Sequence, residues 1–317
     1  MEDQQIQNKL GAILLSAGGV VLFSAKAVFV KMAYAYDIDT VPLLLVRLLI
    51  AMPIYMVIVA VSFSKWRKKY TLKPSHLLII AGLGLGGYYF ASYLDFTGLK
   101  YVSAGVERLI LFVYPTMVVG LSAIINRKRI PEKQMFALLV TYFGVFLIFF
   151  QGILFQDQNN LLIGGMLIIS CAFVYACFMI VTEKLIPYTG SIQITCYTLM
   201  VSCLAVIIHF LLGDHPEMSS LPSEVFWIGG GMAVFSTVIP SFMIAEAVKR
   251  LSASHVAIIG SIGPFTTILL AAIFLGERIT AFQGMGAVVI ISGVLLVNSG
   301  REKIFNRTKR EERIQKA

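Results

Sequence analysis

Charged residues are scarce in this sequence, and their scarcity excludes an ordinary soluble domain. Asp, Glu, Lys and Arg make up 14% of the 317 residues, whereas 58% are hydrophobic. Soluble domains carry about 25% charged residues. The mean hydropathy of +0.83 places the chain in a lipid bilayer. In a membrane protein the formal charge of +9 reflects Lys and Arg residues in the short loops and the tail. No nucleic-acid partner is therefore expected.

Motifs for catalysis, metal binding and nucleotide binding are also missing. The four cysteines lie in apolar runs without a CxxC pair, and they are Cys171, Cys177, Cys196 and Cys203. The chain contains no HExxH zinc motif, no GxSxG elbow and no P-loop. We therefore expect no enzyme, no cofactor, no metal site and no nucleotide-driven pump within this chain.

Long apolar runs are what the sequence does contain. A helix needs about 20 residues to cross about 30 Å of hydrocarbon, and ten runs approach or exceed that length. They lie at 11–33, 41–63, 76–98, 102–125, 133–154, 161–184, 191–212, 224–247, 253–275 and 281–299. The sequence predicts an all-α integral membrane protein with ten transmembrane helices.

The Lys and Arg residues of the short loops predict the orientation, because positive charge is retained on the cytoplasmic side. Segments 64–75 and 126–133 are rich in Lys and Arg, whereas 151–160 and 213–223 contain neither. The first two segments are therefore predicted to be cytoplasmic. A cytoplasmic N-terminus (1–10) and a basic cytoplasmic tail (300–317) follow, in a protein of the plasma (inner) membrane.

An internal duplication organises the chain. A shift of 149 residues lays the segment from Ser92 onto that from Ser241 without a gap, and it superposes Pro115 on Pro264. The two copies are residues 11–154 and 161–299. Each has five predicted spans, and because five is odd, the second copy must cross the membrane in the opposite sense. Inverted-topology five-helix repeats are typical of secondary transporters.

The end of the second copy carries a family resemblance. Pro264 is followed by the run Phe274-Leu275-Gly276-Glu277-Arg278-Ile279 and by a last span that contains Gly284, Gly286 and Gly293. This pattern resembles the EamA-type module of the drug/metabolite transporter superfamily. The first half is similar to the same module through Arg47, Pro115, Gln134 and Gly144.

The resemblance covers about 11–299 and departs at 126–129, where Asn-Arg-Lys-Arg replaces the Leu-Gly-Glu-Arg form. It implies ten helices and transport of small metabolites or amino acids, commonly by export. It attaches no single substrate.

Five charges are predicted to lie in one layer near the outer side of the first repeat. At 1.5 Å per residue, Lys26, Arg47, Glu107 and Arg108 each lie about 8 to 9 Å from the outer boundary, and Asp95 lies slightly nearer to it. An ionisable residue at mid-membrane costs about 2.5 to 3.5 kcal/mol on insertion scales, so each is a candidate functional residue. We expect pairing within the layer, preferably of Lys26 with Glu107.

Helical spacing predicts two faces toward a cavity, one with Tyr88, Ser92 and Asp95 and one with Glu107, Leu111 and Tyr114. The predicted substrate-binding residues are therefore Lys26, Arg47, Tyr88, Ser92, Asp95, Glu107, Arg108 and Tyr114. The alternative is that Arg47, Arg108 and Asp95 extend to the headgroups and that Lys26 with Glu107 is a structural bridge.

Two further roles are predicted. Glu107 and Asp95 are candidates for proton coupling. Pro115 and Pro264, which each remove a backbone hydrogen bond in mid-helix, are candidates for a paired hinge.

The sequence favours a secondary transporter that moves a small polar metabolite, such as an amino acid, by alternating access and most readily as an exporter. A passive channel, a membrane-embedded sensor and a membrane-embedded enzyme are the alternatives. The substrate, the coupling ion and the oligomeric state are left open.

Overall fold

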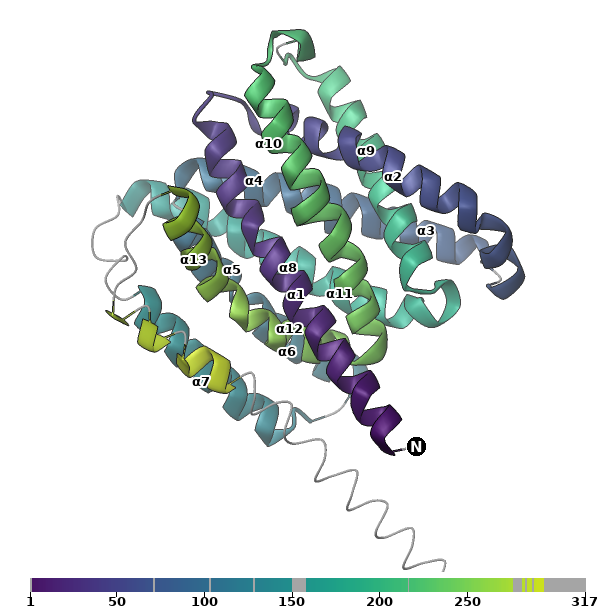
Figure 1. The fold of residues 1–317 in the computed structure, drawn as a ribbon, viewed down its shortest axis with the longest axis vertical. Coiled ribbons are helices and arrows are strands. Elements are labelled where there is room, and N and C mark those ends of the chain that lie inside the picture. The colour runs from purple at the N-terminus through teal and green to yellow at the C-terminus, as the bar shows by residue number, and fades with distance from the viewer. Residues whose placement is uncertain are drawn as a thin grey trace, which may run out of the picture.

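The computed structural model describes residues 2–70, 72–102, 104–127, 129–149, 158–215, 217–275, 281–282, 284–286 and 288–293, and all regular structure in these ranges is helical (Figure 1). The predicted basic tail and the turn that carries Glu277 lie outside these ranges.

The first half of the chain contains eight helical elements. They are α1 (Glu2–Tyr34), α2 (Thr40–Lys69), α3 (Pro74–Leu83), the π-helix η1 (Gly84–Phe90), α4 (Ala91–Tyr101), α5 (Ala104–Leu111), α6 (Tyr114–Asn126) and α7 (Glu132–Phe149). Here α3, η1 and α4 together make one crossing, and α5 with α6 makes another. The first half therefore has five crossings.

The second half repeats this plan. Its elements are α8 (Gln158–Thr189), α9 (Ser191–Leu212), the short 3-10 helix η3 (Met218–Ser220), α10 (Ser223–Ala233), the π-helix η4 (Val234–Val238), α11 (Ile239–Arg250), α12 (Ala253–Ile259), the 3-10 helix η5 (Gly260–Ile262) and α13 (Gly263–Leu275). A last, shorter apolar helix, Gly284–Gly293, brings this plan to ten helical segments. The predicted all-helical membrane fold is confirmed.

The outer surface is apolar, as a lipid-facing surface must be. Leu78 is 76% exposed, Leu212 is 84% exposed and Trp227 is 83% exposed. Such side chains would form a large aggregation-prone patch in water but are stable against lipid tails. Within the described residues, seven crossings are long and apolar enough to span a membrane by length and composition alone.

The two halves also share their irregular elements. The π-helix η1 interrupts the third crossing and η4 interrupts the eighth, and the offset of 149 residues places one upon the other. The same offset maps α6 onto α13, which begins at the residue before Pro264 just as α6 begins at the residue before Pro115. The duplication therefore extends to local backbone geometry.

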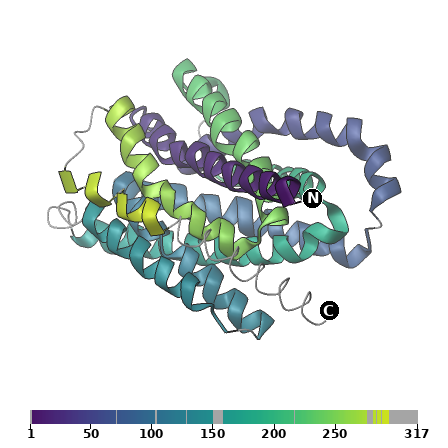
Figure 2. The same cartoon turned by 60° about the horizontal axis from the view of Figure 1, so that its bottom comes forward.

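Helices of the two halves pack reciprocally. Helix α1 packs against α11 and α13, and its repeat equivalent α8 packs against α4 and α6, the equivalents of α11 and α13. Helix α2 packs against its own equivalent, α9. Figure 2 shows α1, in purple, lying across the green helices of the second half. This exchange of partners relates the halves by a local two-fold axis, as an inverted repeat requires.

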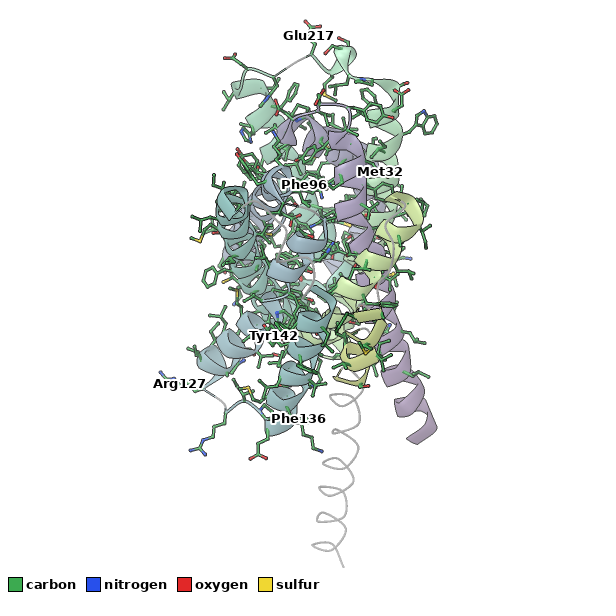
Figure 3. The ribbon with its side chains drawn as sticks, turned by 90° about the vertical axis from the view of Figure 1, so that its left-hand side faces the viewer. Met32, Phe96, Arg127, Phe136, Tyr142 and Glu217 are labelled. Carbon is green, nitrogen blue, oxygen red and sulfur yellow. The ribbon has the colours of Figure 1, made fainter. Side chains whose placement is uncertain are left out.

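The loops predicted to lie on opposite sides of the membrane lie at opposite ends of the molecule. Figure 3 shows Arg127 and Phe136 near one end and Glu217 at the other. This arrangement agrees with the distribution of Lys and Arg between segments 126–133 and 213–223.

Candidate functional site

A cavity of about 90 Å³, measured as the space open to the centre of a water molecule, lies between the two halves. Residues of α1, α2, η1, α4, α5 and α6 line it from the first half, and residues of α8, α9, η4, α11, η5 and α13 line it from the second. One water molecule needs about 10 to 15 Å³ on this measure, so the cavity can hold several waters or one small solute.

Six of the eight predicted binding residues line this cavity, and they are Lys26, Arg47, Tyr88, Ser92, Arg108 and Tyr114. Asp95 and Glu107 do not line it, although both are fully buried. They lie behind the cations of the wall, next to Lys26 and Arg108. Three cations therefore line the cavity, and the two carboxylates lie outside its lining.

The pairing of the charges differs from the sequence-based expectation. Lys26 Nζ on α1 lies 2.6 Å from Asp95 Oδ2 on α4, whereas Glu107 Oε2 lies 3.3 Å from Nε of its neighbour Arg108. The prediction that Lys26 pairs with Glu107 is therefore wrong, since Lys26 pairs with Asp95. Residue depths estimated from helical rise could not distinguish two carboxylates that lie at similar depth on adjacent helices.

Burial also excludes the alternative that these charges extend to the headgroups. Lys26, Arg47, Asp95, Glu107 and Arg108 are all at most 6% exposed. Arg108 additionally donates to the carbonyl oxygens of Phe23 (3.2 Å) and Ser24 (3.5 Å) on α1. The charge cluster therefore connects α1, α4 and α5 inside the protein.

Arg47 on α2 has a different environment. Its guanidinium donates to Ser92 Oγ at 3.2 Å and lies 4.9 Å from the centre of the Phe96 ring. None of the ion pairs between described residues includes Arg47. Two turns further along α2, Tyr55 shares a hydrogen bond of 3.2 Å with Ser241, the repeat equivalent of Ser92. Helix α2 therefore contacts equivalent serines of both halves.

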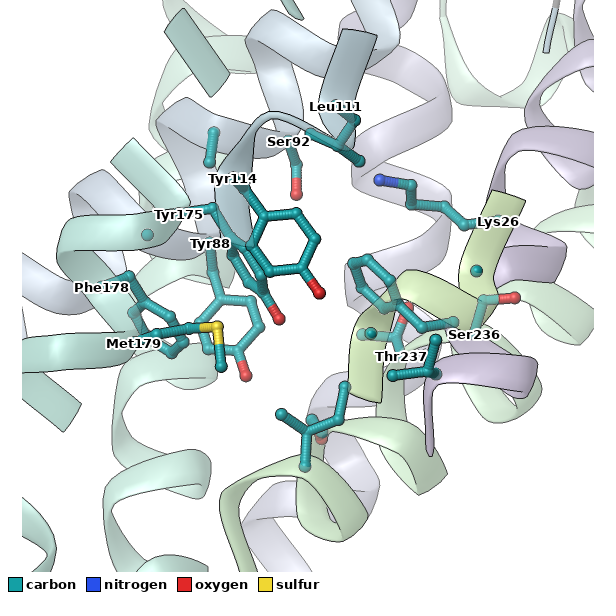
Figure 4. A pocket seen from close by; sticks show the side chains of 18 of the residues that line it. Lys26, Tyr88, Ser92, Leu111, Tyr114, Tyr175, Phe178, Met179, Ser236 and Thr237 are labelled. Atoms are coloured by element: carbon teal, nitrogen blue, oxygen red, sulfur yellow. The ribbon is translucent and has the colours of Figure 1, made fainter. Parts of the chain in front are cut away.

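Several aromatic rings form another part of the cavity wall, which we call the aromatic wall. Ring centres are 4.8 Å apart for Tyr88 and Phe178, 5.5 Å for Tyr114 and Tyr175, and 5.9 Å for Tyr175 and Phe178. In Figure 4 the rings of Tyr88, Tyr114 and Tyr175 lie side by side, with Lys26 across from them. The cavity lining thus combines cations with amphipathic aromatic rings.

Both candidate hinge prolines lie where a crossing is broken. Pro115 is buried near the start of α6, and Pro264 lines the cavity near the start of α13. Tyr114 Oη donates to the carbonyl oxygen of Ala257 on α12 at 3.3 Å, so the two broken crossings contact each other. Their motion stays a prediction.

The sequence reading missed the contribution of the second half. Hydroxyl and aromatic side chains line the cavity from that side, among them Tyr175, Phe178, Thr182, Thr195, Thr198, Ser236, Thr237 and Ser241. The duplication was the signal that could have identified some of them, because the offset of 149 residues carries Tyr88 to Thr237 and Ser92 to Ser241.

Ten helical segments in two inverted halves around a central cavity are an architecture typical of membrane transporters. The EamA-like transporter family matches residues 10–150 and 162–299, so the chain belongs to that family, and it is a membrane transporter rather than an enzyme.

Similar proteins agree with this assignment. The uncharacterized transporter YcbK of Bacillus subtilis is 30% identical over 98% of this chain and 99% of its own length. A probable amino-acid metabolite efflux pump of Salmonella typhimurium is 24% identical over 70% of this chain and 76% of its own. A crystal structure with 13% identity has the same fold, with a TM-score of 0.74 over 92% of this chain and 98% of that chain.

Proposed function

We propose that this protein is a secondary transporter that exports a small polar metabolite of the amino-acid class from the cell. The observation that carries the proposal is the cavity between the halves, whose lining includes three cations and several aromatic rings. The name of the Salmonella relative, a probable amino-acid metabolite efflux pump, supports the substrate class and the direction.

The transport mechanism in this proposal is alternating access. The two repeats, residues 11–154 and 161–299, rock about the cavity, and the breaks before Pro115 and Pro264 absorb the bending. Reciprocal packing of α1 with α11 and of α8 with α4 supports this mechanism, because equivalent contacts on the two sides can exchange closed and open arrangements.

Proton coupling through Glu107 or Asp95 is part of the proposal. Both carboxyl groups are fully buried and lie in one cluster, with Asp95 beside Lys26 and Glu107 beside Arg108. Two carboxylates enclosed in one cluster repel each other, and binding a proton to one of them relieves that repulsion. Binding or release of that proton changes the charge behind the cavity wall.

Counterflow in proteoliposomes tests the transporter. Vesicles loaded with an unlabelled amino acid should accumulate the labelled form faster than empty vesicles, because a carrier exchanges substrate across the membrane and a channel does not. Glu107→Gln should keep exchange but remove its acceleration by a pH gradient. Equal uptake by loaded and empty vesicles across the amino-acid panel would contradict the transporter proposal, and unchanged acceleration in Glu107→Gln would contradict coupling through Glu107.

A further inference from the structure

The charges around the cavity do not balance, and Arg47 is the surplus. The layer contains the cations Lys26, Arg47 and Arg108 and the carboxylates Asp95 and Glu107. Asp95 is engaged by Lys26 at 2.6 Å, and Glu107 by Arg108 at 3.3 Å. Arg47 therefore has no carboxylate partner of its own among the described residues.

The surroundings of Arg47 do not replace such a partner. The side chain is 3% exposed, and Nε has no hydrogen-bond acceptor. One terminal nitrogen donates to Ser92 Oγ, and the ring of Phe96 covers one face. A guanidinium presents five donors in a planar fork, so most of its hydrogen-bonding capacity is unused. A buried cation in this condition is costly to fold, which indicates that it serves a ligand.

We propose that Arg47, assisted by Ser92, binds the carboxylate of the transported molecule, and that the substrate is a monocarboxylate such as a zwitterionic amino acid. This inference rests on the proposed function. A carboxylate matches the guanidinium fork in two parallel hydrogen bonds. When both carboxyl groups of the cluster are ionised, one surplus positive charge remains, and it matches the single negative charge of a carboxylate.

The aromatic wall accounts for the rest of such a substrate. Tyr88, Tyr114 and Tyr175 line the cavity together with Arg47. Their ring faces attract an ammonium group through their quadrupoles, and their bodies accept an apolar side chain. Ser92 and Ser241 supply neutral hydroxyl groups from equivalent positions of the two halves.

The first test needs no ligand. Arg47→Gln removes the surplus buried charge, so the purified protein should melt at a higher temperature than the wild type. Lys100→Gln is the matched control, because it removes the same charge from the half-exposed Lys100–Asp39 bridge and should change the melting temperature little. A lower melting temperature for Arg47→Gln would show that the charge is structural and would overturn the proposal.

The second test identifies the recognised group. The probes are the proteinogenic amino acids and their matching carboxamides, read as thermal protection of the purified protein. At least one amino acid should protect the wild type while its carboxamide does not, and Arg47→Gln should bind it roughly tenfold to a hundredfold more weakly. Arg47→Lys should recover part of the affinity.

Two results would overturn the carboxylate site: protection that survives in Arg47→Gln, and the absence of protection by every amino acid. Protection without counterflow would instead contradict the transporter proposal and leave the carboxylate site intact. Counterflow of an amino acid that is unaffected by Arg47→Gln would instead contradict the carboxylate site and leave the transporter proposal intact.

Discussion

Two ion pairs with the same separation show how burial decides the importance of a single residue. Lys26–Asp95 and Lys100–Asp39 both have N–O distances of 2.6 Å. The first pair is at most 5% exposed, whereas the side chains of the second are 35% and 62% exposed. Removing one member of a buried pair leaves an uncompensated charge that water cannot reach.

Replacing Asp95 by Asn should therefore lower the free energy of unfolding by about 3 to 5 kcal/mol, because Lys26 loses its partner. Asp39→Asn should change it by less than about 1 kcal/mol. Unfolding in mixed micelles with increasing SDS measures both. The double change Lys26→Met with Asp95→Leu should restore most of the stability, and if it unfolds as easily as Asp95→Asn, the buried charge is not the cause.

Residue identity alone predicted that these charges would be important, but it could not predict their partners. The cost of charge in lipid made Lys26, Arg47, Asp95, Glu107 and Arg108 candidates, and the structure brings all five to one buried region. Which carboxylate meets Lys26 depends on how α4 and α5 are rotated relative to α1. One sequence contains no measure of that rotation.

Among the helices, the repeated π-helices distinguish this fold from a simple bundle. Residues Tyr88 in η1 and Thr237 in η4 both line the cavity. A π-turn widens a helix by one residue and re-aims the side chains beside it, and such turns occur frequently at functional sites. The sequence predicted both crossings as continuous helices. The hydropathy of a segment depends on its composition, so it is the same for an α-helix and for a helix with a π-turn.

Close packing of η1 against α9 depends on glycine. A Cβ at Gly84 would lie 2.5 Å from the backbone oxygen of Thr198 and 2.7 Å from Cβ of Val201, whereas a Cβ at Gly82 meets no atom within 4 Å. Gly84→Ala should therefore destabilise the protein by about 1 to 3 kcal/mol, because backbone cannot move aside as a flexible side chain can.

Gly82→Ala is the matched control two residues earlier in the same crossing, and it should be neutral or slightly stabilising because alanine favours the helix. Melting temperatures of the two variants in detergent give the comparison. Equal effects of the two substitutions would show that the close approach of α9 is unimportant to stability.

At the scale of the whole molecule, the duplication was the most informative feature of the sequence. It correctly predicted the relation between the halves, because a shift of 149 residues reproduces prolines, glycines and loops together. The same shift relates the cavity-lining Tyr88 and Ser92 to Thr237 and Ser241, which also line the cavity. A repeat in sequence predicts two similar halves in space, and the cavity lies between those halves.

The inverted relation makes a prediction about sidedness that repeat-equivalent residues can test. Arg129 and Arg278 are superposed by the offset of 149 residues, although Arg278 lies outside the described residues. Because each copy has an odd number of crossings, Arg129→Cys should react with a membrane-impermeant maleimide only from the cytoplasmic side and Arg278→Cys only from outside. Positive charge supports this assignment, since 126–133 is rich in Lys and Arg.

Glu217→Cys supplies an internal reference for the outer side, because Figure 3 shows Glu217 at the end of the molecule opposite Arg127. The background should have all four cysteines replaced by alanine, since Cys177 is only half-buried whereas the other three are buried. Labelling of Arg129→Cys and Arg278→Cys from the same side would rule out inverted insertion. It would also contradict the exchange of equivalent contacts proposed for alternating access, which requires the two copies to face opposite sides of the membrane.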